Sequence, residues 1–191
     1  MKGIIFNLLE EAVSMEYGDA TWDALLDRAG LEGAYTSLGS YDDAEVIALV
    51  DVAAAVLGIG PQEVLRWFGK RAMPLLAARF PTFFGAHSSA RSFLLTLNNI
   101  IHPEVRKLYP GASPPVFDFD NGPDGALIIG YNSARRLCSL AEGFMRGAAE
   151  YYHERVDICQ PQCMHEGASK CVFKVTFYRD SEADTSAADH V

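Results

Sequence analysis

The spacing of apolar residues changes once along the chain, near residue 110, and this change limits the possible folds. From residue 2 to about residue 107, apolar residues recur at helical spacing. After "YPGASPP" they form short runs that are bounded by turn residues, as strands are. The sequence therefore predicts an α+β protein in which an N-terminal helical lobe precedes a C-terminal lobe built on a sheet.

Helix boundaries can be recognised in the first part of the chain. Asp42 and Glu45 have the spacing of a capping box ahead of "VIALVDVAAAVL". Gly60 and Pro61 place a proline at the opening of the next helix, "QEVLRWFGKRAMPLLAARF". These signals predict a helical lobe over about residues 1–110.

The second part of the chain predicts the element order β-β-α-β-β. The runs "VFDFD" and "ALIIGY" flank the turn residues 121–125 and indicate a hairpin. A helix over about residues 133–152 follows, and "RVDICQ" and "CVFKVTFYR" predict two more strands. A four-stranded antiparallel sheet with one helix is expected over about residues 111–178, so that residues 1–178 form a single domain. The polar segment 179–191 is expected to be a disordered tail.

Charge and hydropathy exclude several classes of partner. The formal net charge of −9 and the pI near 4.9 argue against a nucleic-acid or anionic-membrane surface, because both need a cationic face. The longest apolar segment, "VIALVDVAAAVLGIG", contains Asp51 and is shorter than the ~20 residues that a bilayer requires. The opening segment has glutamates inside its apolar stretch and no small-residue cleavage site, unlike a signal peptide. We expect a cytoplasmic protein with a small-molecule or protein partner.

His102 is the histidine with the most informative surroundings. It lies in "SFLLTLNNIIHPEVRKLYP", where Phe93, Leu94, Leu97 and Ile101 form an apolar helix face on the same side. One interpretation is a core histidine that is hydrogen-bonded to a backbone carbonyl. The other is an axial ligand for haem iron, because a neutral imidazole in an apolar pocket suits that role.

Tyr131, Ser133 and Arg135 alternate in "YNSARRLCSLAEG", where an apolar strand gives way to the predicted helix. Alternation in extended backbone would point all three side chains the same way. A phenol, a hydroxyl and a guanidinium suit a ligand with two carboxylates, such as haem, and a helix that begins near Ser133 would add the positive end of its dipole. A turn that is merely polar is the alternative, and the histidine on the preceding helix favours the haem clamp.

These residues, with the opening "MKGIIFNLLEE", resemble the H-NOX (haem nitric oxide/oxygen binding) family over residues 1 to about 178. The resemblance implies that His102 is the proximal ligand of a haem held between the two lobes. It also implies that Tyr131, Ser133 and Arg135 bind the propionates and that Pro115 packs on the porphyrin and distorts it. Because "CQPQCMH" lacks the CxxCH spacing, a noncovalent haem b is expected.

The candidates for the other haem face are the apolar residues Ile5, Leu9 and Leu140. In family members that bind O2, a tyrosine lies five residues after the clamp arginine, and here that position is Leu140. We therefore expect binding of nitric oxide (NO) and carbon monoxide (CO) without a stable O2 complex. A haem enzyme such as a peroxidase would need a polar acid–base pair on this face, so no catalytic activity is expected.

The resemblance also implies the mode of signalling. NO bound to ferrous haem would break the Fe–His102 bond, and the domain would then regulate a separate protein. By resemblance, this protein partner is a histidine kinase or a cyclic-di-GMP enzyme. A haem carrier is an alternative function.

Four cysteines fall in the C-terminal third of the chain: Cys138, Cys159, Cys163 and Cys171. In a cytosolic chain such a cluster suggests metal or redox chemistry before it suggests disulfides, although buried cysteines can also act as small hydrophobes. We expect a tetrahedral zinc site formed by the four sulfurs. Some kinase-linked H-NOX proteins carry zinc here, and the resemblance extends to three of these cysteines. Cys159 is the predicted fourth ligand, His165 is its competitor, and a zinc-thiolate redox sensor is a further alternative function.

Overall fold

The computed structural model describes residues 1–179. The tail predicted at 179–191 therefore lies, beyond Arg179, outside the described residues. The N-terminal part is helical, as predicted, and a π-helical turn directly precedes the last of its helices. The elements of this part are α1 (Gly3–Tyr17), α2 (Asp19–Ala29), α3 (Asp43–Leu57), α4 (Pro61–Arg79), α5 (Pro81–Gly85), α6 (Ala90–Leu94), the π-turn η1 (Leu97–Ile101) and α7 (His102–Leu108).

The starts of α3 and α4 follow the sequence signals with one difference. The Gly60 N–H donates to Glu63 Oε2 at 2.9 Å, and Pro61 opens α4 as predicted. At α3, Asp42 accepts a hydrogen bond from the Ala44 N–H, which makes it the N-cap. The predicted capping box is not completed, because the Glu45 carboxylate instead accepts the hydroxyl of Tyr35 at 2.8 Å.

The C-terminal part has the predicted β-β-α-β-β order and forms one antiparallel sheet. Its elements are β1 (Val116–Asn121), the short 3-10 turn η2 (Pro123–Gly125), β2 (Leu127–Asn132), α8 (Cys138–Tyr151), β3 (Glu154–Gln162), the 3-10 turn η3 (Met164–Glu166) and β4 (Cys171–Arg179). The strand order is β1-β2-β4-β3, so β1 and β3 are the edges. Phe117 of β1 pairs with Tyr131 of β2, and Leu127 of β2 pairs with Val175 of β4. The α+β prediction is confirmed.

The helix that follows β2 begins later than predicted. We expected it to start near Ser133, but α8 begins at Cys138 and residues 133–137 form a turn. Arg136 has a φ of 54°, in the left-handed region, and a right-handed helix cannot pass through such a residue. The polar residues 131–135 therefore precede the helix, and the first turn of α8 does not contain them.

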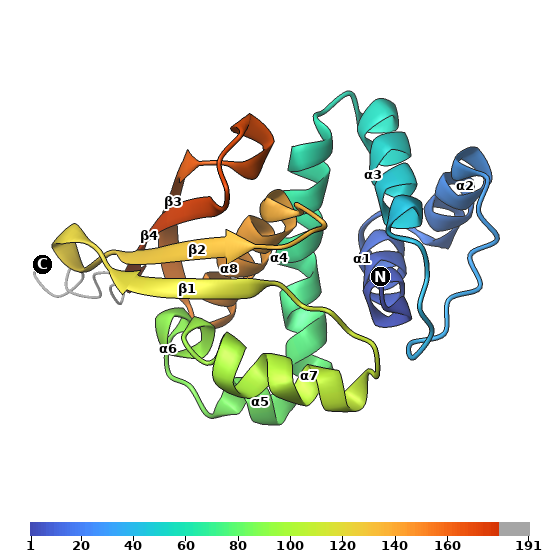
Figure 1. Cartoon of the computed structure of the whole chain (residues 1–191). Helices are drawn as coiled ribbons and strands as arrows, with labels where there is room; N and C mark the ends of the chain where they lie inside the picture. The colour runs from blue at the N-terminus through green and yellow to red at the C-terminus, as the bar shows by residue number, and fades with distance from the viewer. Residues whose placement is uncertain (180–191) are drawn as a thin grey trace, which may run out of the picture.

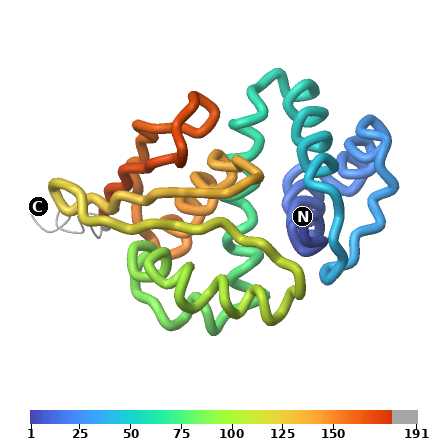
Figure 2. Tube along the Cα trace, viewed as in Figure 1, coloured from blue at the N-terminus to red at the C-terminus, as the bar shows by residue number. Residues whose placement is uncertain are grey.

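Helix α4 runs between the first three helices and the sheet, and it crosses α8 closely (Figures 1 and 2). A Cβ atom on Gly143 would lie 2.3 Å from the Arg66 carbonyl oxygen, and one on Gly69 would lie 2.4 Å from the Leu140 carbonyl oxygen. Glycine at both positions therefore allows the two backbones to approach each other.

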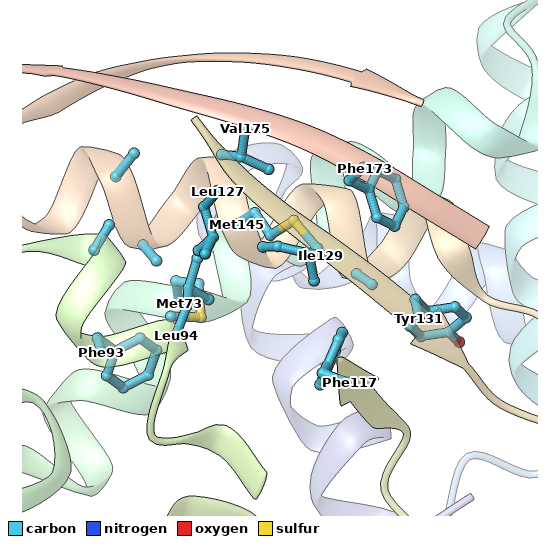
Figure 3. Close-up of a cluster of buried hydrophobic side chains, with 14 of the residues drawn as sticks. Met73, Phe93, Leu94, Phe117, Leu127, Ile129, Tyr131, Met145, Phe173 and Val175 are labelled. Atoms are coloured by element: carbon cyan, nitrogen blue, oxygen red, sulfur yellow. The ribbon is translucent and has the colours of Figure 1, made fainter. Parts of the chain in front are cut away.

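Two clusters of buried apolar side chains lie beside this helix pair. One joins α1 to α4 with Leu137 and Leu140. The other lies under the sheet, where Figure 3 shows Leu127, Ile129 and Val175 gathered with Met145 of α8. Helices α5 and α6 also contribute to this second cluster, so the change of secondary structure near residue 110 does not divide the core.

Within residues 1–179, no single helix has the length and apolarity needed to cross a bilayer. Helices α3 and α4 meet those criteria only as a pair, and their axes differ by 109°.

Candidate functional site

A cavity of about 290 Å³ is lined by residues of α1, α4, α5, α6, α7, α8, β1 and β2. Most of its lining is apolar. The predicted site residues that line it are Ile5, His102, Pro115, Tyr131, Ser133, Arg135 and Leu140. Leu9 does not line it, contrary to our expectation, because it lies one helical turn beyond Ile5 and is buried among α1 to α4.

His102 presents a neutral imidazole to this cavity. Burial lowers the pKa of His102 to about 4, the nearby Arg106 acts in the same direction, and a backbone contact with Pro115 opposes both. The ring centre lies 5.9 Å from that of Phe117. Nδ1 is buried and has no hydrogen-bond partner within the described residues. An uncharged, partly unsatisfied imidazole of this kind is suited to bind a metal.

The three residues of the proposed clamp lie on one side of the backbone. Tyr131 is 3% exposed, and Ser133 and Arg135 are half-buried, whereas the intervening Asn132 and Ala134 are exposed. Burial raises the pKa of Tyr131, so its phenol stays protonated and can donate a hydrogen bond. Together the three side chains offer two hydroxyls and one cation at the edge of the cavity.

Arg135 is held in place by groups far away in the sequence. Its Nε donates to Asp43 Oδ1 at 2.9 Å, and an Nη donates to the carbonyl oxygen of Ser113 at 2.7 Å. A guanidinium has five N–H donors, so others are available for a carboxylate ligand. Asp43 had no role in our interpretation of the sequence, because nothing in its local sequence links it to Arg135.

Comparison with known proteins agrees with this geometry. A model of the Haem-NO-binding family matches residues 2–160. The chain belongs to the H-NOX family. Members of this family are haem-based gas sensors and not catalysts, which agrees with the expectation that the protein is not an enzyme.

Several solved H-NOX structures are similar to this chain. An H-NOX protein from S. oneidensis in the Fe(II)NO state is 33% identical, with a TM-score of 0.88 over 94% of this chain and 100% of that one. An unliganded Fe(II) H-NOX protein from K. algicida is 25% identical, with a TM-score of 0.82 over 94% and 98%. A soluble guanylate cyclase of Caenorhabditis elegans, gcy-32, is 22% identical over 162 residues. The chain spans only 23% of the length of that relative.

The residues of this H-NOX chain fit the haem that the family binds. The imidazole of His102 lacks a partner at Nδ1, the lining is apolar, and Arg135 supplies a cation near two hydroxyls. Along α1, α4 and α8 the lining consists only of apolar side chains: Ile4, Ile5, Met73, Leu76, Leu140, Ala141, Phe144 and Met145. These helices therefore offer no side-chain hydrogen-bond donor to a ligand in the cavity.

Three of the four cysteines come together outside this cavity. Cys138 begins α8, Cys163 follows β3, and Cys171 begins β4. Their sulfur atoms all lie within 4.8 Å of one another, and those of Cys138 and Cys163 are 3.9 Å apart. Two thiolates on a tetrahedral zinc ion lie ~3.8 Å apart, since each Zn–S bond is ~2.3 Å long. Burial raises the pKa of the Cys171 thiol to about 12. The hydrogen bond that its sulfur accepts from the Met164 N–H acts to lower this pKa but does not offset the burial.

Neither predicted fourth ligand belongs to this group. Ile158 pairs with the buried Val175, so the next residue, Cys159, points to the exposed face of the sheet. His165 is exposed, and its Nε2 lies 2.7 Å from the Arg136 carbonyl oxygen. Gln160 lies where the pairing of β3 with β4 shifts register, is half-buried, and has a buried Nε2 with no hydrogen-bond partner within the described residues.

Proposed function

We propose that residues 1–178 form a single H-NOX domain that binds haem b through His102 and senses NO. The observation that supports this most strongly is the neutral, half-buried imidazole of His102, with its buried and unpartnered Nδ1, in a cavity whose lining from α1, α4 and α8 carries no side-chain hydrogen-bond donor. Haem held by His102 would supply a ferrous iron atom that binds diatomic gases, and the proposed response to NO is loss of the bond between the iron and His102. CO is the second expected ligand.

The clamp residues orient the haem in this proposal. Tyr131 and Ser133, which line the cavity, would donate hydrogen bonds to the propionates, and Arg135 would supply the compensating positive charge. The contacts of Arg135 with Asp43 and with the Ser113 carbonyl hold its side chain in place before the haem binds. Pro115, which also lines the cavity, packs against the porphyrin.

Release of His102 would produce the signal. The residue begins α7, so loss of a bond from its imidazole would free this helix and would shift the population between two arrangements of the same fold. The signal then passes to a separate protein, for which family resemblance suggests a histidine kinase or a cyclic-di-GMP enzyme. The relative gcy-32, whose name describes a guanylate cyclase, differs from this arrangement, because the matching region is 23% of that same protein.

Replacement of His102 tests the proposal. His102→Gly should lose haem, or hold it only when imidazole is added. His87→Gly is the matched control, because His87 does not line the cavity. In the wild type, NO added to the ferrous protein should give the absorption spectrum of a five-coordinate complex at room temperature. An unchanged haem spectrum in His102→Gly, or a six-coordinate NO complex in the wild type, would contradict the proposal.

A second proposal is a structural zinc ion held by Cys138, Cys163 and Cys171. The three sulfur atoms within 4.8 Å of one another support it. Zinc would supply no redox chemistry of its own and would join the start of α8 to β4 and to the loop after β3. We propose Gln160 or a water molecule as the fourth ligand of the zinc ion, since the side chain of Cys159 is exposed and points away from the three sulfur atoms.

A further inference from the structure

Asn98 attaches the turn before His102 to the edge of the sheet. Its Oδ1 accepts the N–H of Phe117 at 3.2 Å, and its Nδ2 donates to the carbonyl oxygen of the same residue. One side chain thus satisfies both backbone groups of Phe117. Because β1 is an edge strand, these two groups face away from β2, and without Asn98 they would have no partner on the sheet.

The backbone around Asn98 has an unusual conformation. Residues 97–101 form a π-turn in which the Ile101 N–H donates to the Thr96 carbonyl oxygen at 3.1 Å. Single π-turns inside helical segments occur frequently at functional sites. Asn98 and His102 are separated by four residues, about one turn, so both lie on the same side of this segment.

Phe117 links the two residues spatially. Its backbone is held by Asn98, and its ring centre lies 5.9 Å from that of His102 and 5.7 Å from that of Tyr131. The same strand position therefore contacts the histidine and one residue of the clamp. A movement of the π-turn relative to β1 must break the two Asn98 hydrogen bonds first.

From this geometry we infer that Asn98 is a positioning residue for His102. The two bonds to Phe117 fix the π-turn against the sheet and so set how far the imidazole reaches into the cavity. The inference rests on the proposed haem ligation by His102. When NO weakens that bond, the Asn98 contacts oppose the movement of α7, and they thereby control how readily the histidine is released.

The test compares two neighbouring asparagines in the ferrous, haem-loaded protein. Asn98→Ala should lower the Fe–His stretching frequency measured by resonance Raman spectroscopy. It should also speed the conversion of the NO complex from six- to five-coordinate by about fivefold or more, since two hydrogen bonds no longer oppose the movement. Asn99→Ala is the control, because Asn99 is exposed. Asn98→Asp keeps an acceptor for the Phe117 N–H and should give an intermediate rate.

A purely structural role would give a different result. If Asn98→Ala lowers the melting temperature but leaves the stretching frequency and the conversion rate equal to those of Asn99→Ala, the inference is overturned. If the wild-type protein shows no Fe–His stretching band, the proposed ligation by His102 is wrong, whatever the Asn98 variants show.

Hydrogen exchange covers the case in which Asn98→Ala does not fold. In the ferrous wild-type protein, the Phe117 amide should exchange slowly although it faces the free edge of the sheet, and NO should accelerate this exchange. Rapid exchange of the Phe117 amide before NO is added would contradict the inference. So would an equal effect of NO on the exchange rates of the Phe117 and Asp118 amides.

Discussion

Arg135 and Asp43 are 92 residues apart in the sequence and form a hydrogen-bonded ion pair, with Nε 2.9 Å from Oδ1. The Met1 ammonium lies 2.6 Å from the same oxygen. Burial acts to raise the pKa of the Asp43 carboxyl, but the hydrogen bonds from Arg135 and Met1 outweigh it and lower the pKa. The pair connects the start of α3 to the turn after β2, and so joins the helical part of the chain to the sheet at the edge of the cavity.

Asp43→Asn should therefore speed the loss of haem by up to about fivefold, because Arg135 loses the charged partner that orients it. The measurement is the rate of haem transfer to an excess of acceptor protein. Asp51→Asn removes a charge from the exposed side of the same helix and serves as the control. Equal transfer rates in the two variants would show that the pair has no role in haem retention.

Arg135→Ala should speed haem loss further, because it also leaves a propionate without a cation. If Asp43 acts through Arg135, the double variant should lose haem no faster than Arg135→Ala alone. Additive effects would instead mean that the two residues act separately.

The neutral His102 imidazole predicts a pH dependence for the haem-free protein. Its pKa is about 4 in the folded chain, against an ordinary value of 6.5. Between about pH 4 and pH 6.5, the two pKa values, His102 binds more protons in the unfolded chain than in the folded chain. The free energy of unfolding should therefore rise with pH in this range, and His102 should add no further pH dependence above it. His102→Leu should remove this component. Urea unfolding at several pH values measures it, and His153→Asn, at an exposed position, should keep the wild-type slope. An identical slope in His102→Leu would contradict the expectation.

The sequence predicted the sheet well because each strand carries a local signal. "CVFKVTFYR" alternates and is bounded by turn residues, and β4 spans Cys171–Arg179 as predicted. The start of α8 was predicted too early, since nothing in the local sequence indicates the left-handed backbone of Arg136.

Residues whose roles depend on tertiary contacts were not predictable in the same way. In the sequence, Asp43 is an acidic residue at the start of a helix and Asn98 is an ordinary helical amide. Only the folded chain brings Asp43 to Arg135 and Asn98 to Phe117. Cys159, the predicted fourth ligand, is exposed and lies outside the group formed by the other three cysteines, because spacing alone does not determine which face of β3 a side chain occupies.

Gln160 is one of the two fourth ligands that we propose for the zinc ion. Its Nε2 is buried and has no partner within the described residues, and the oxygen and nitrogen of such an amide are interchangeable by rotation. Gln160→His should tighten zinc binding about tenfold or more, since imidazole is a better zinc ligand than an amide oxygen. Competition with a chelator measures the affinity.

Two further variants separate the possible ligands. Cys163→Ser should lose most of the zinc, whereas Cys159→Ser, on the exposed face, should bind as tightly as the wild type. A loss of zinc in Cys159→Ser would restore Cys159 as a ligand. Less than one zinc ion per wild-type chain under reducing conditions would contradict the site itself.

Leu140 is the residue that we expect to set which gases a haem in the cavity would bind. It is 6% exposed, lines the cavity, and lies on a helix that offers only apolar side chains there. Ser139 is buried next to it but does not line the cavity. O2 bound to ferrous haem carries partial negative charge and needs a hydrogen-bond donor beside it, whereas NO and CO do not. The ferrous wild-type protein should therefore bind NO and CO and form no stable O2 complex in air.

Leu140→Tyr should create an O2 complex, because it places a phenol hydroxyl in the cavity. A hydrogen bond to a charged group contributes about 1.5–3 kcal/mol, so the dissociation of O2 should slow by roughly tenfold to a hundredfold. Leu140→Phe is the control, since it adds the same ring without the hydroxyl. The Soret band of each ferrous protein is followed after exposure to air. A stable O2 complex in the wild type would overturn the argument. So would equal O2 dissociation rates in the tyrosine and phenylalanine variants, because the ring, and not the donor, would then account for the change.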